Sequence, residues 1–231
     1  MTAFQNCCTA LFRIGRVLRD YLGAGAIRRR HRIVDIESLR RYIESRANHV
    51  TQISLYGYLR TRAGTRFQQL FGDNEFVRLL NIARWQVWLA CVSDLAVYAG
   101  GLVLRRTSVG PQAVGRLIGE AVDSILAEIG LPAEAGPEYP AAAEQVRSRL
   151  RSVEWASVQD DDTPFSLSPG ALVHWAPIMD ELKKLDEEIV ANSMRFRWQE
   201  TRRELRTLLD AEALVGAPRA DAGPRSPGGR T

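Results

Sequence analysis

The clearest hydrophobic periodicity in the chain lies between Pro111 and Ile129. Apolar side chains recur there at spacings of three and four, the period of a helix with one buried face. They are Val114, Leu117, Ile118, Ala121, Val122, Ile125, Leu126 and Ile129. Proline suits the first turn of a helix, and Gly130 and Pro132 mark its end. The sequence therefore predicts a helix over 111–129.

The same spacing predicts two longer helices before this one. The first begins at Asp35, has an acid in its first turn, and stops at Gly64. The second is capped by Asp73 or Asn74 and extends over about 75–105. Both segments are longer than an average helix, which favours a bundle of packed helices.

The C-terminal half carries weaker helix signals. A short helix is expected over 141–153, and Ser168 is expected to cap another helix that begins at Pro169. From Ile178 the apolar spacing predicts one long helix that ends near Leu214. Its predicted core-facing side chains are Leu182, Leu185, Ile189, Phe196, Leu205 and Leu208.

These elements predict an all-α fold, a helical bundle of about five or six helices. We expect three parts along the chain. Residues 1–34 form a basic amphipathic arm, residues 35–214 the helical domain, and residues 215–231 a disordered tail rich in Gly, Pro, Arg and Ser.

The arm combines apolar residues at helical spacing with arginines and only one acid, Asp20. Seven arginines stand in residues 1–34, which favours an anionic membrane surface as partner. The residues expected to bind it are Phe4, Leu11, Phe12, Arg13, Arg16, Arg19, Arg28, Arg29 and Arg30. The alternative, an arm that packs on the body with a solvated charged face, stays open.

The most hydrophobic stretch, VWLACVSDLAVYAGGLVL over 87–104, carries one carboxylate, Asp94. It is long enough to cross a membrane, but a carboxylate at the bilayer centre costs about 2.5–3.5 kcal/mol. A helical projection separates a bulky apolar face from a small, polar face around Ser93 and Asp94. We therefore expect a packed bundle helix, in which a buried Asp94 needs a partner.

Composition narrows the function classes. Hydrophobic residues at 45% and charged residues at 25% indicate a globular chain. Among the 31 basic residues only Lys183 and Lys184 are lysine.

Arginines interleaved with tyrosines over 56–66 could bind nucleic acid through Arg60, Arg62 and Arg66. A helix end with arginines at its dipole and aromatics in the core is favoured instead.

Cysteine and histidine usage argues against a disulfide framework or a metal centre. Three cysteines and no signal peptide favour the cytoplasm, with attachment at the inner face of the membrane. The histidines lack ligand spacing, and the acidic run 160–162 lacks the pattern of a calcium loop and predicts a solvated turn. No cofactor is expected.

Ser93, Asp94 and His49 are the candidate catalytic residues, although no Gly-x-Ser-x-Gly elbow occurs. The blocks ESRANHVTQISLYGYLRTRAGTRF and NIARWQVWLACVSDLAVYAGGL resemble those of a small bacterial family of uncharacterised all-helical proteins, sometimes labelled esterase. The resemblance covers about 36–104 and extends to SMRFRWQETRRELR. It implies ester hydrolysis and transfers no catalytic residue.

The sequence thus favours a non-enzymatic helical interaction protein that docks on a membrane or on a partner protein. A hydrolase of esterase type and a nucleic-acid-binding protein are the alternatives, and a homo-oligomer is compatible with each of them.

Overall fold

The computed structural model describes residues 31–217, and in this range the chain is all-α, as predicted. Residues 32–217 belong to one compact unit. The α-helices described are α2 (Ile36–Ala63), α3 (Asn74–Arg106), α4 (Pro111–Ile129), α5 (Tyr139–Ser152), α6 (Leu167–Trp175), α7 (Asp180–Leu208) and α8 (Ala211–Gly216). Three short 3-10 helices lie in the connections: η1 (Gly64–Arg66), η2 (Gln69–Gly72) and η3 (Trp155–Ser157).

Helix ends that depend on local chemistry lie where the sequence predicted them. Asp35 accepts a hydrogen bond from the backbone N–H of Ser38 at 2.7 Å, and Ser38 Oγ accepts one from the N–H of Asp35 at 3.1 Å. This reciprocal pair is a capping box. Asp73 caps α3, and Pro111 stands in the first turn of α4. Gly130 ends α4 with a φ of 64°, a conformation that glycine adopts without strain.

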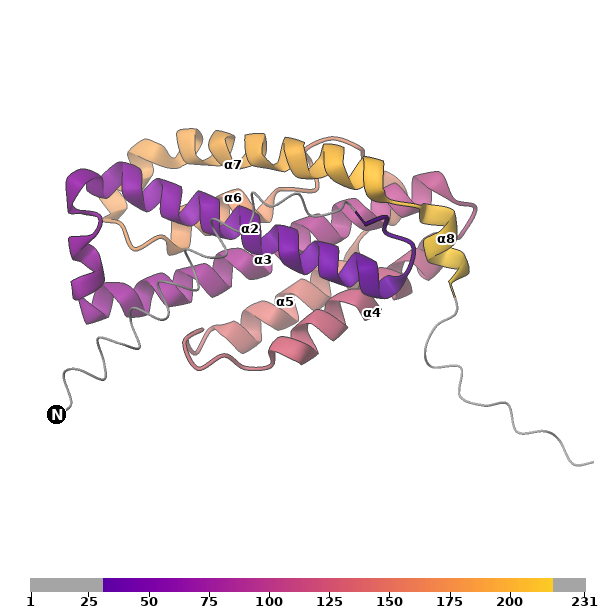
Figure 1. Cartoon of the computed structure of the whole chain (residues 1–231), viewed down its shortest axis with the longest axis horizontal. Coiled ribbons are helices and arrows are strands. Elements are labelled where there is room, and N and C mark those ends of the chain that lie inside the picture. The colour runs from indigo at the N-terminus through magenta and orange to yellow at the C-terminus, as the bar shows by residue number, and fades with distance from the viewer. Residues whose placement is uncertain (1–30, 218–231) are drawn as a thin grey trace, which may run out of the picture. The chain divides into compact units, whose positions relative to one another are not determined.

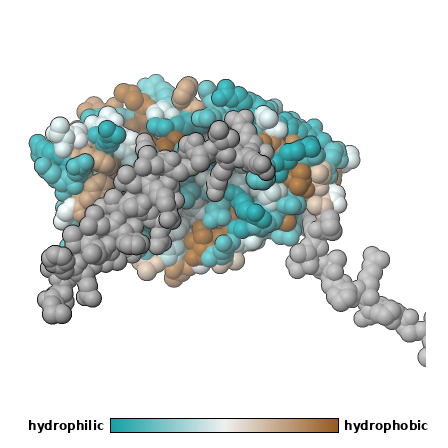
Figure 2. Space-filling model, viewed as in Figure 1, coloured by the Kyte–Doolittle hydropathy of each residue, from teal (hydrophilic) through white to brown (hydrophobic). Residues whose placement is uncertain are grey.

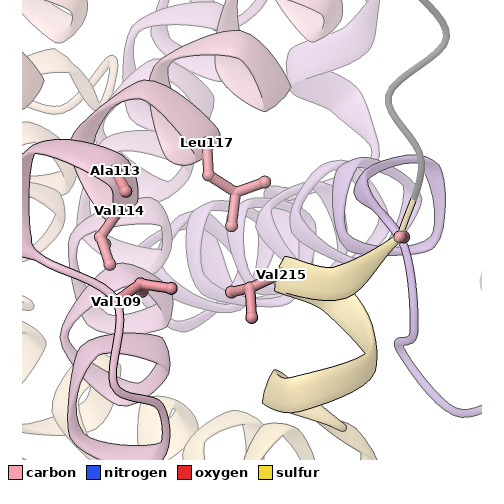
Figure 3. Close-up of a pocket in the computed structure, with 6 residues that line it drawn as sticks. Val109, Ala113, Val114, Leu117 and Val215 are labelled. Carbon is pink, nitrogen blue, oxygen red and sulfur yellow. The ribbon is translucent and has the colours of Figure 1, made fainter.

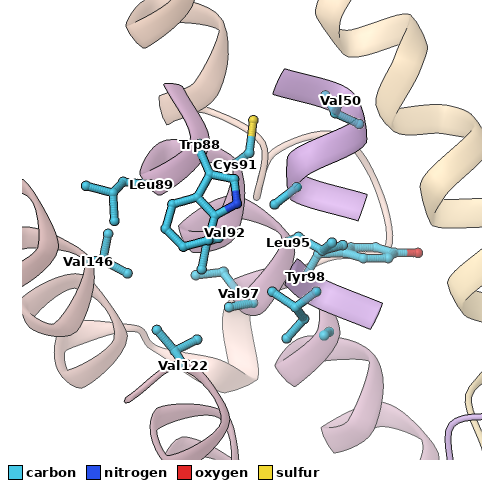
Figure 4. Packing of buried hydrophobic residues seen from close by; sticks show 14 of the residues in the cluster. Val50, Trp88, Leu89, Cys91, Val92, Leu95, Val97, Tyr98, Val122 and Val146 are labelled. Atoms are coloured by element: carbon cyan, nitrogen blue, oxygen red, sulfur yellow. The ribbon is translucent and has the colours of Figure 1, made fainter. Parts of the chain in front are cut away.

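The central helix of the bundle is α3, with α2, α4, α5 and α6 packed around it (Figure 1). Every residue over 91–103 is buried, so both faces of this helix lie against protein. Figure 4 shows Trp88 and Val92 of α3 beside Val122 of α4 and Val146 of α5. By length and composition α3 could cross a membrane, but 89% of its most apolar window is buried inside the bundle. It is the core helix of this unit.

Glycines on α3 let the loop that follows α5 lie directly against α3. A Cβ added at Gly100 would overlap ring carbons of Trp155, and one at Gly101 would overlap the side chain of Val158. On the other side of the indole, a Cβ at Gly115 of α4 would lie 3.0 Å from Trp155 Nε1. The missing side chains therefore form the slot in which η3 sits.

The start of α6 differs from the prediction. The helix begins at Leu167, so Ser168 and Pro169 lie inside its first turn rather than at its boundary. Ser168 is fully buried, and Ser166, the residue at the N-cap position, makes no side-chain capping bond. Local sequence placed the cap on the wrong serine because the group that caps α6 comes from another helix, as described below.

The prediction of one helix from 178 to 214 is wrong, because α7 ends at Leu208 and a separate α8 follows. The N–H of Ile33 donates to the carbonyl of Leu208 at 2.9 Å, and the N–H of Asp210 donates to the carbonyl of Ile33 at 3.0 Å. This short parallel bridge between Ile33 and Leu209 takes the backbone out of the helix. Asp210 then accepts a hydrogen bond from the N–H of Ala213 and so caps α8.

The predicted core face of α7 is wrong over most of the helix, although Leu205 and Leu208 are buried as predicted. Leu185, Ile189 and Phe196 are 74%, 72% and 72% exposed. Before Leu205, the side chains that α7 buries instead are Asp186, Val190, Met194, Trp198 and Thr201. Two apolar stripes run along this helix, and spacing alone does not show which one faces the bundle.

The boundaries of the helical unit lie slightly outside the predicted 35–214. Ile33 is 2% exposed and belongs to the core, and Arg32 Nη2 lies 2.8 Å from Asp210 Oδ2. At the other end α8 continues to Gly216. Most of the predicted arm (1–30) and most of the predicted tail (218–231) lie outside the described residues.

The slot for Trp155 predicts opposite effects for two helical glycine substitutions. Gly100→Ala should lower the free energy of unfolding by about 1–3 kcal/mol, because the methyl group overlaps a buried indole. Gly119→Ala should be neutral or stabilise by up to about 1 kcal/mol, because a Cβ there meets nothing within 4 Å. Urea unfolding measures both. Equal effects of the two substitutions would contradict the slot.

Candidate functional site

The three candidate catalytic residues do not lie together. Ser93 and Asp94 are adjacent on α3 and completely buried, whereas His49 lies on an exposed position of α2. Among the described residues no hydrogen bond joins His49 to either of them. The pKa of His49 is lowered by partial burial and by the charge of Arg46, with Arg197 acting in the same direction.

Asp94 is held by donors from two other elements. Its Oδ1 accepts a hydrogen bond from Arg149 Nη1 of α5 at 2.6 Å and one from the N–H of Leu167 at 3.3 Å. Its Oδ2 accepts from the N–H of Ser168 at 2.8 Å. These two N–H groups open α6, so Asp94 caps α6 from across the bundle. The prediction that Asp94 needs a partner is confirmed.

Arg149 joins this carboxylate to the loop between α5 and α6. Its Nη1 also donates to Ser93 Oγ at 3.1 Å, and its Nη2 donates to the carbonyl of Pro164 at 2.9 Å. A weaker contact reaches Ser166 Oγ at 3.5 Å. One guanidinium therefore fixes α3, α5 and the segment that leads into α6.

The cluster continues from α6 to α7. Trp198 Nε1 donates to Ser168 Oγ at 3.0 Å, and the Trp198 ring stacks on Phe165 with centroids 4.6 Å apart. Trp198 is completely buried. The polar centre at Asp94 thus extends over four helices, α3, α5, α6 and α7, through Arg149, Ser168 and Trp198.

The electrostatics of the cluster suit a structural role better than a catalytic one. Burial raises the pKa of Asp94, whereas the Arg149 guanidinium and the bonds from Ser168 act in the opposite direction. The three groups that bond to the carboxylate are donors, so they favour its ionised form, although burial leaves the pKa above its usual value. Burial also raises the pKa of Cys91 strongly, which keeps that thiol protonated. Ser93 accepts a hydrogen bond from the Arg149 guanidinium, and within 31–217 no hydrogen bond joins its hydroxyl to a histidine that could activate it.

Two further polar clusters fasten α7 to α2, and sequence analysis missed both. Near one end, Tyr42 Oη donates to the carbonyl of Thr201 at 3.0 Å, and Arg46 Nη2 lies 2.5 Å from Glu204 Oε1. Burial raises the pKa of Tyr42 strongly, and the charge of Glu204 raises it further. This phenol therefore remains a donor.

Near the other end of α2, Tyr58 Oη donates to Asp186 Oδ2 at 3.0 Å, and Arg62 forms a salt bridge with the same carboxylate. Burial and the bond to Asp186 raise the pKa of Tyr58 to about 12. Tyr58 and Arg62 are therefore both bonded to Asp186. The three arginines considered for nucleic acid, Arg60, Arg62 and Arg66, are all exposed on this end of the unit.

The acidic run is not simply a solvated turn. Asp160 accepts hydrogen bonds from Tyr98 Oη at 2.6 Å and from Arg206 Nη1 at 3.0 Å. Arg202 Nη2 donates to the carbonyl of Asp160 at 2.9 Å. These two arginines bind the loop to α7. No group of three or more potential metal ligands occurs within 31–217.

An open hollow of about 300 Å³ lies beside the last described residues. Figure 3 shows Val109, Ala113, Val114 and Leu117 on one side and Val215 of α8 on the other. Its lining is aliphatic, with no titratable group, so it offers apolar surface but no chemistry.

No protein-family model matches this chain, and neither the curated proteins nor the solved structures give a match. The family resemblance noted in two sequence blocks stays a prediction.

The buried ion pair predicts unequal effects for two arginines on α5. Arg149→Leu should cost about 3–5 kcal/mol of unfolding free energy, because it leaves Asp94 buried without a countercharge. Arg151→Leu removes only an exposed pair with Glu144 and should change stability by less than about 1 kcal/mol. Urea unfolding at pH 7 measures the difference.

The loss of unfolding free energy in Arg149→Leu should also depend on pH. Burial raises the pKa of Asp94 in the folded state above its unfolded value, so ionisation opposes folding once the countercharge is gone. Stability lost at pH 7 should therefore be partly regained as the pH falls toward 5, relative to the unsubstituted chain. An equal loss of unfolding free energy at pH 7 and at pH 5 would contradict an ionised Asp94.

Proposed function

We propose that this chain is a non-enzymatic interaction protein that docks peripherally on the anionic, cytoplasmic face of a membrane through residues 1–30. The observation that carries this proposal is the charge of that segment. It holds Arg13, Arg16, Arg19, Arg28, Arg29 and Arg30 against the single acid Asp20. The helical unit serves as the body that the arm brings to the surface.

The helical unit supports a docking role for the arm, because the buried polar groups of the unit hold its helices together. Ser93 and Asp94 are buried and bonded to Arg149, and His49 lies apart on α2. A hydrolase would need a nucleophile in contact with a base, and these residues do not provide one. The span-length helix α3 is packed within the bundle, which leaves the arm as the better candidate for membrane contact.

The chemistry of the arm fits a membrane surface. Apolar residues such as Phe4, Leu11 and Phe12 can enter the boundary between headgroups and acyl chains, while arginines meet lipid phosphates. Each basic residue near an anionic leaflet contributes about 1 kcal/mol. Arg32 is excluded from this set because it pairs with Asp210 of the body. The six remaining arginines are enough for reversible, salt-sensitive attachment.

Vesicle cosedimentation of the full chain tests the proposal. The chain should bind phosphatidylcholine vesicles that contain about 30% phosphatidylglycerol, and high salt should release it. Arg29→Glu combined with Arg30→Glu should weaken binding by about tenfold or more.

The matched control is Arg60→Glu combined with Arg66→Glu, which makes the same charge change on exposed positions of the body. It should leave binding within about twofold of the unsubstituted chain, because long-range effects of surface charge are screened. Equal loss in both variants, or binding to vesicles without anionic lipid, would refute docking through the arm.

A further inference from the structure

The outer face of α7 carries an apolar stripe that the bundle does not cover. Leu185, Ile189 and Phe196 are more than 70% exposed, and their spacings of four and seven place them on one side of the helix. Leu185 and Phe196 are about 16 Å apart along the helix axis. In Figure 1 α7 lies along one edge of the bundle, and in Figure 2 hydrophobic residues interrupt the polar surface at that edge.

This stripe is separate from the face that anchors α7. Val190, Met194 and Trp198 are buried toward the bundle, and Asp186 and Glu204 bind arginines of α2. The helix is thus held in place without any contribution from Leu185, Ile189 or Phe196. Large exposed apolar side chains gathered on one helix face typically mark an interface.

The charges beside the stripe change sign along the helix. Glu181, Glu188, Arg195 and Arg202 follow one another at intervals of seven, so they share one flank. Two acids, with Lys184 one turn from each, lie in the first half, and two arginines lie in the second. Glu181, Glu188 and Arg195 are exposed, whereas Arg202 is occupied by Asp160.

We propose that two copies of this chain associate through an antiparallel pairing of their α7 helices. Antiparallel packing about a two-fold axis sets the acidic half of each flank against the basic half of the other, whereas parallel packing would turn this flank away from its copy, so the pairs would not form. A two-fold axis near Ala191 places Glu188 beside Arg195 of the second copy and, by symmetry, repeats the pair. The same axis places Leu185 near Phe196 of the second copy.

The register follows from the sequence positions alone. The midpoints of Leu185 with Phe196 and of Glu188 with Arg195 both fall within one residue of Ala191. One axis therefore satisfies the apolar and the charged contacts together, as an isologous interface requires. An anionic membrane would be repelled by Glu181 and Glu188, so this face suits a second copy better than a lipid surface.

Three apolar side chains on each copy form a smaller contact than a standard interface of about 800 Å² per partner. The dimer should consequently be reversible and visible over protein concentrations of about 1–200 µM. Phe196→Ser should weaken it by about tenfold or more with no loss of thermal stability, because this side chain is 72% exposed. Leu131→Ser, at a 70% exposed position between α4 and α5, is the matched control and should leave the dimer intact.

A charge swap tests the antiparallel register. Glu188→Arg alone brings two pairs of like charges together and should weaken the dimer by about tenfold, as should Arg195→Glu alone. The double variant Glu188→Arg/Arg195→Glu recreates both pairs and should return the dissociation constant to within about threefold. Glu187→Arg makes the same charge change on the neighbouring exposed residue, off this flank, and should have little effect.

Sedimentation equilibrium of the full chain and its variants at low salt gives these constants. A monomer at all concentrations would overturn the proposal, as would a dimer that Phe196→Ser leaves unchanged. Failure of the double variant to recover would overturn the antiparallel register. Because no residue of the arm is altered, these outcomes are independent of membrane docking.

Discussion

The ion pair between Asp94 and Arg149 is the interaction on which the arrangement of the other helices depends. Asp94 stands in the middle of the helix that forms the core, where an unpaired charge would be strongly destabilising. Its three bonds bring in α5 through Arg149 and the first turn of α6 through Leu167 and Ser168. The single carboxylate thereby holds α5 and the first turn of α6 against that side of α3.

The consequences extend to the surface of α7. Ser168 binds Trp198, and Trp198 turns one face of α7 toward the bundle. Tyrosine and arginine pairs near both ends of α2 fix the same rotation through Glu204 and Asp186. Once α7 is held in this way, its second apolar stripe must face outward. A buried polar network thus determines which apolar residues remain exposed for association.

Local chemistry made much of the fold predictable. Asp35, Asp73, Pro111 and Gly130 lie at helix ends because their effects act within one turn of the chain. The need of Asp94 for a partner also followed from its position. The identity of that partner did not, because Arg149 lies 55 residues away in a chain whose 31 basic residues are nearly all arginine. Contacts between distant segments likewise ended α7 at Leu208, where Ile33 bonds to the backbone, and decided which stripe of α7 is buried.

The proposed function assigns different partners to two charge patterns. The arm is uniformly basic and suits an anionic surface, whereas the flank of α7 changes sign and suits a copy of itself. Fractionation of cells that contain the full chain, by a high-salt wash and then detergent, tests membrane docking most directly. The chain is expected in the membrane fraction, and salt alone should release it. Release only by detergent, or absence from the membrane fraction at low salt, would contradict docking through the arm.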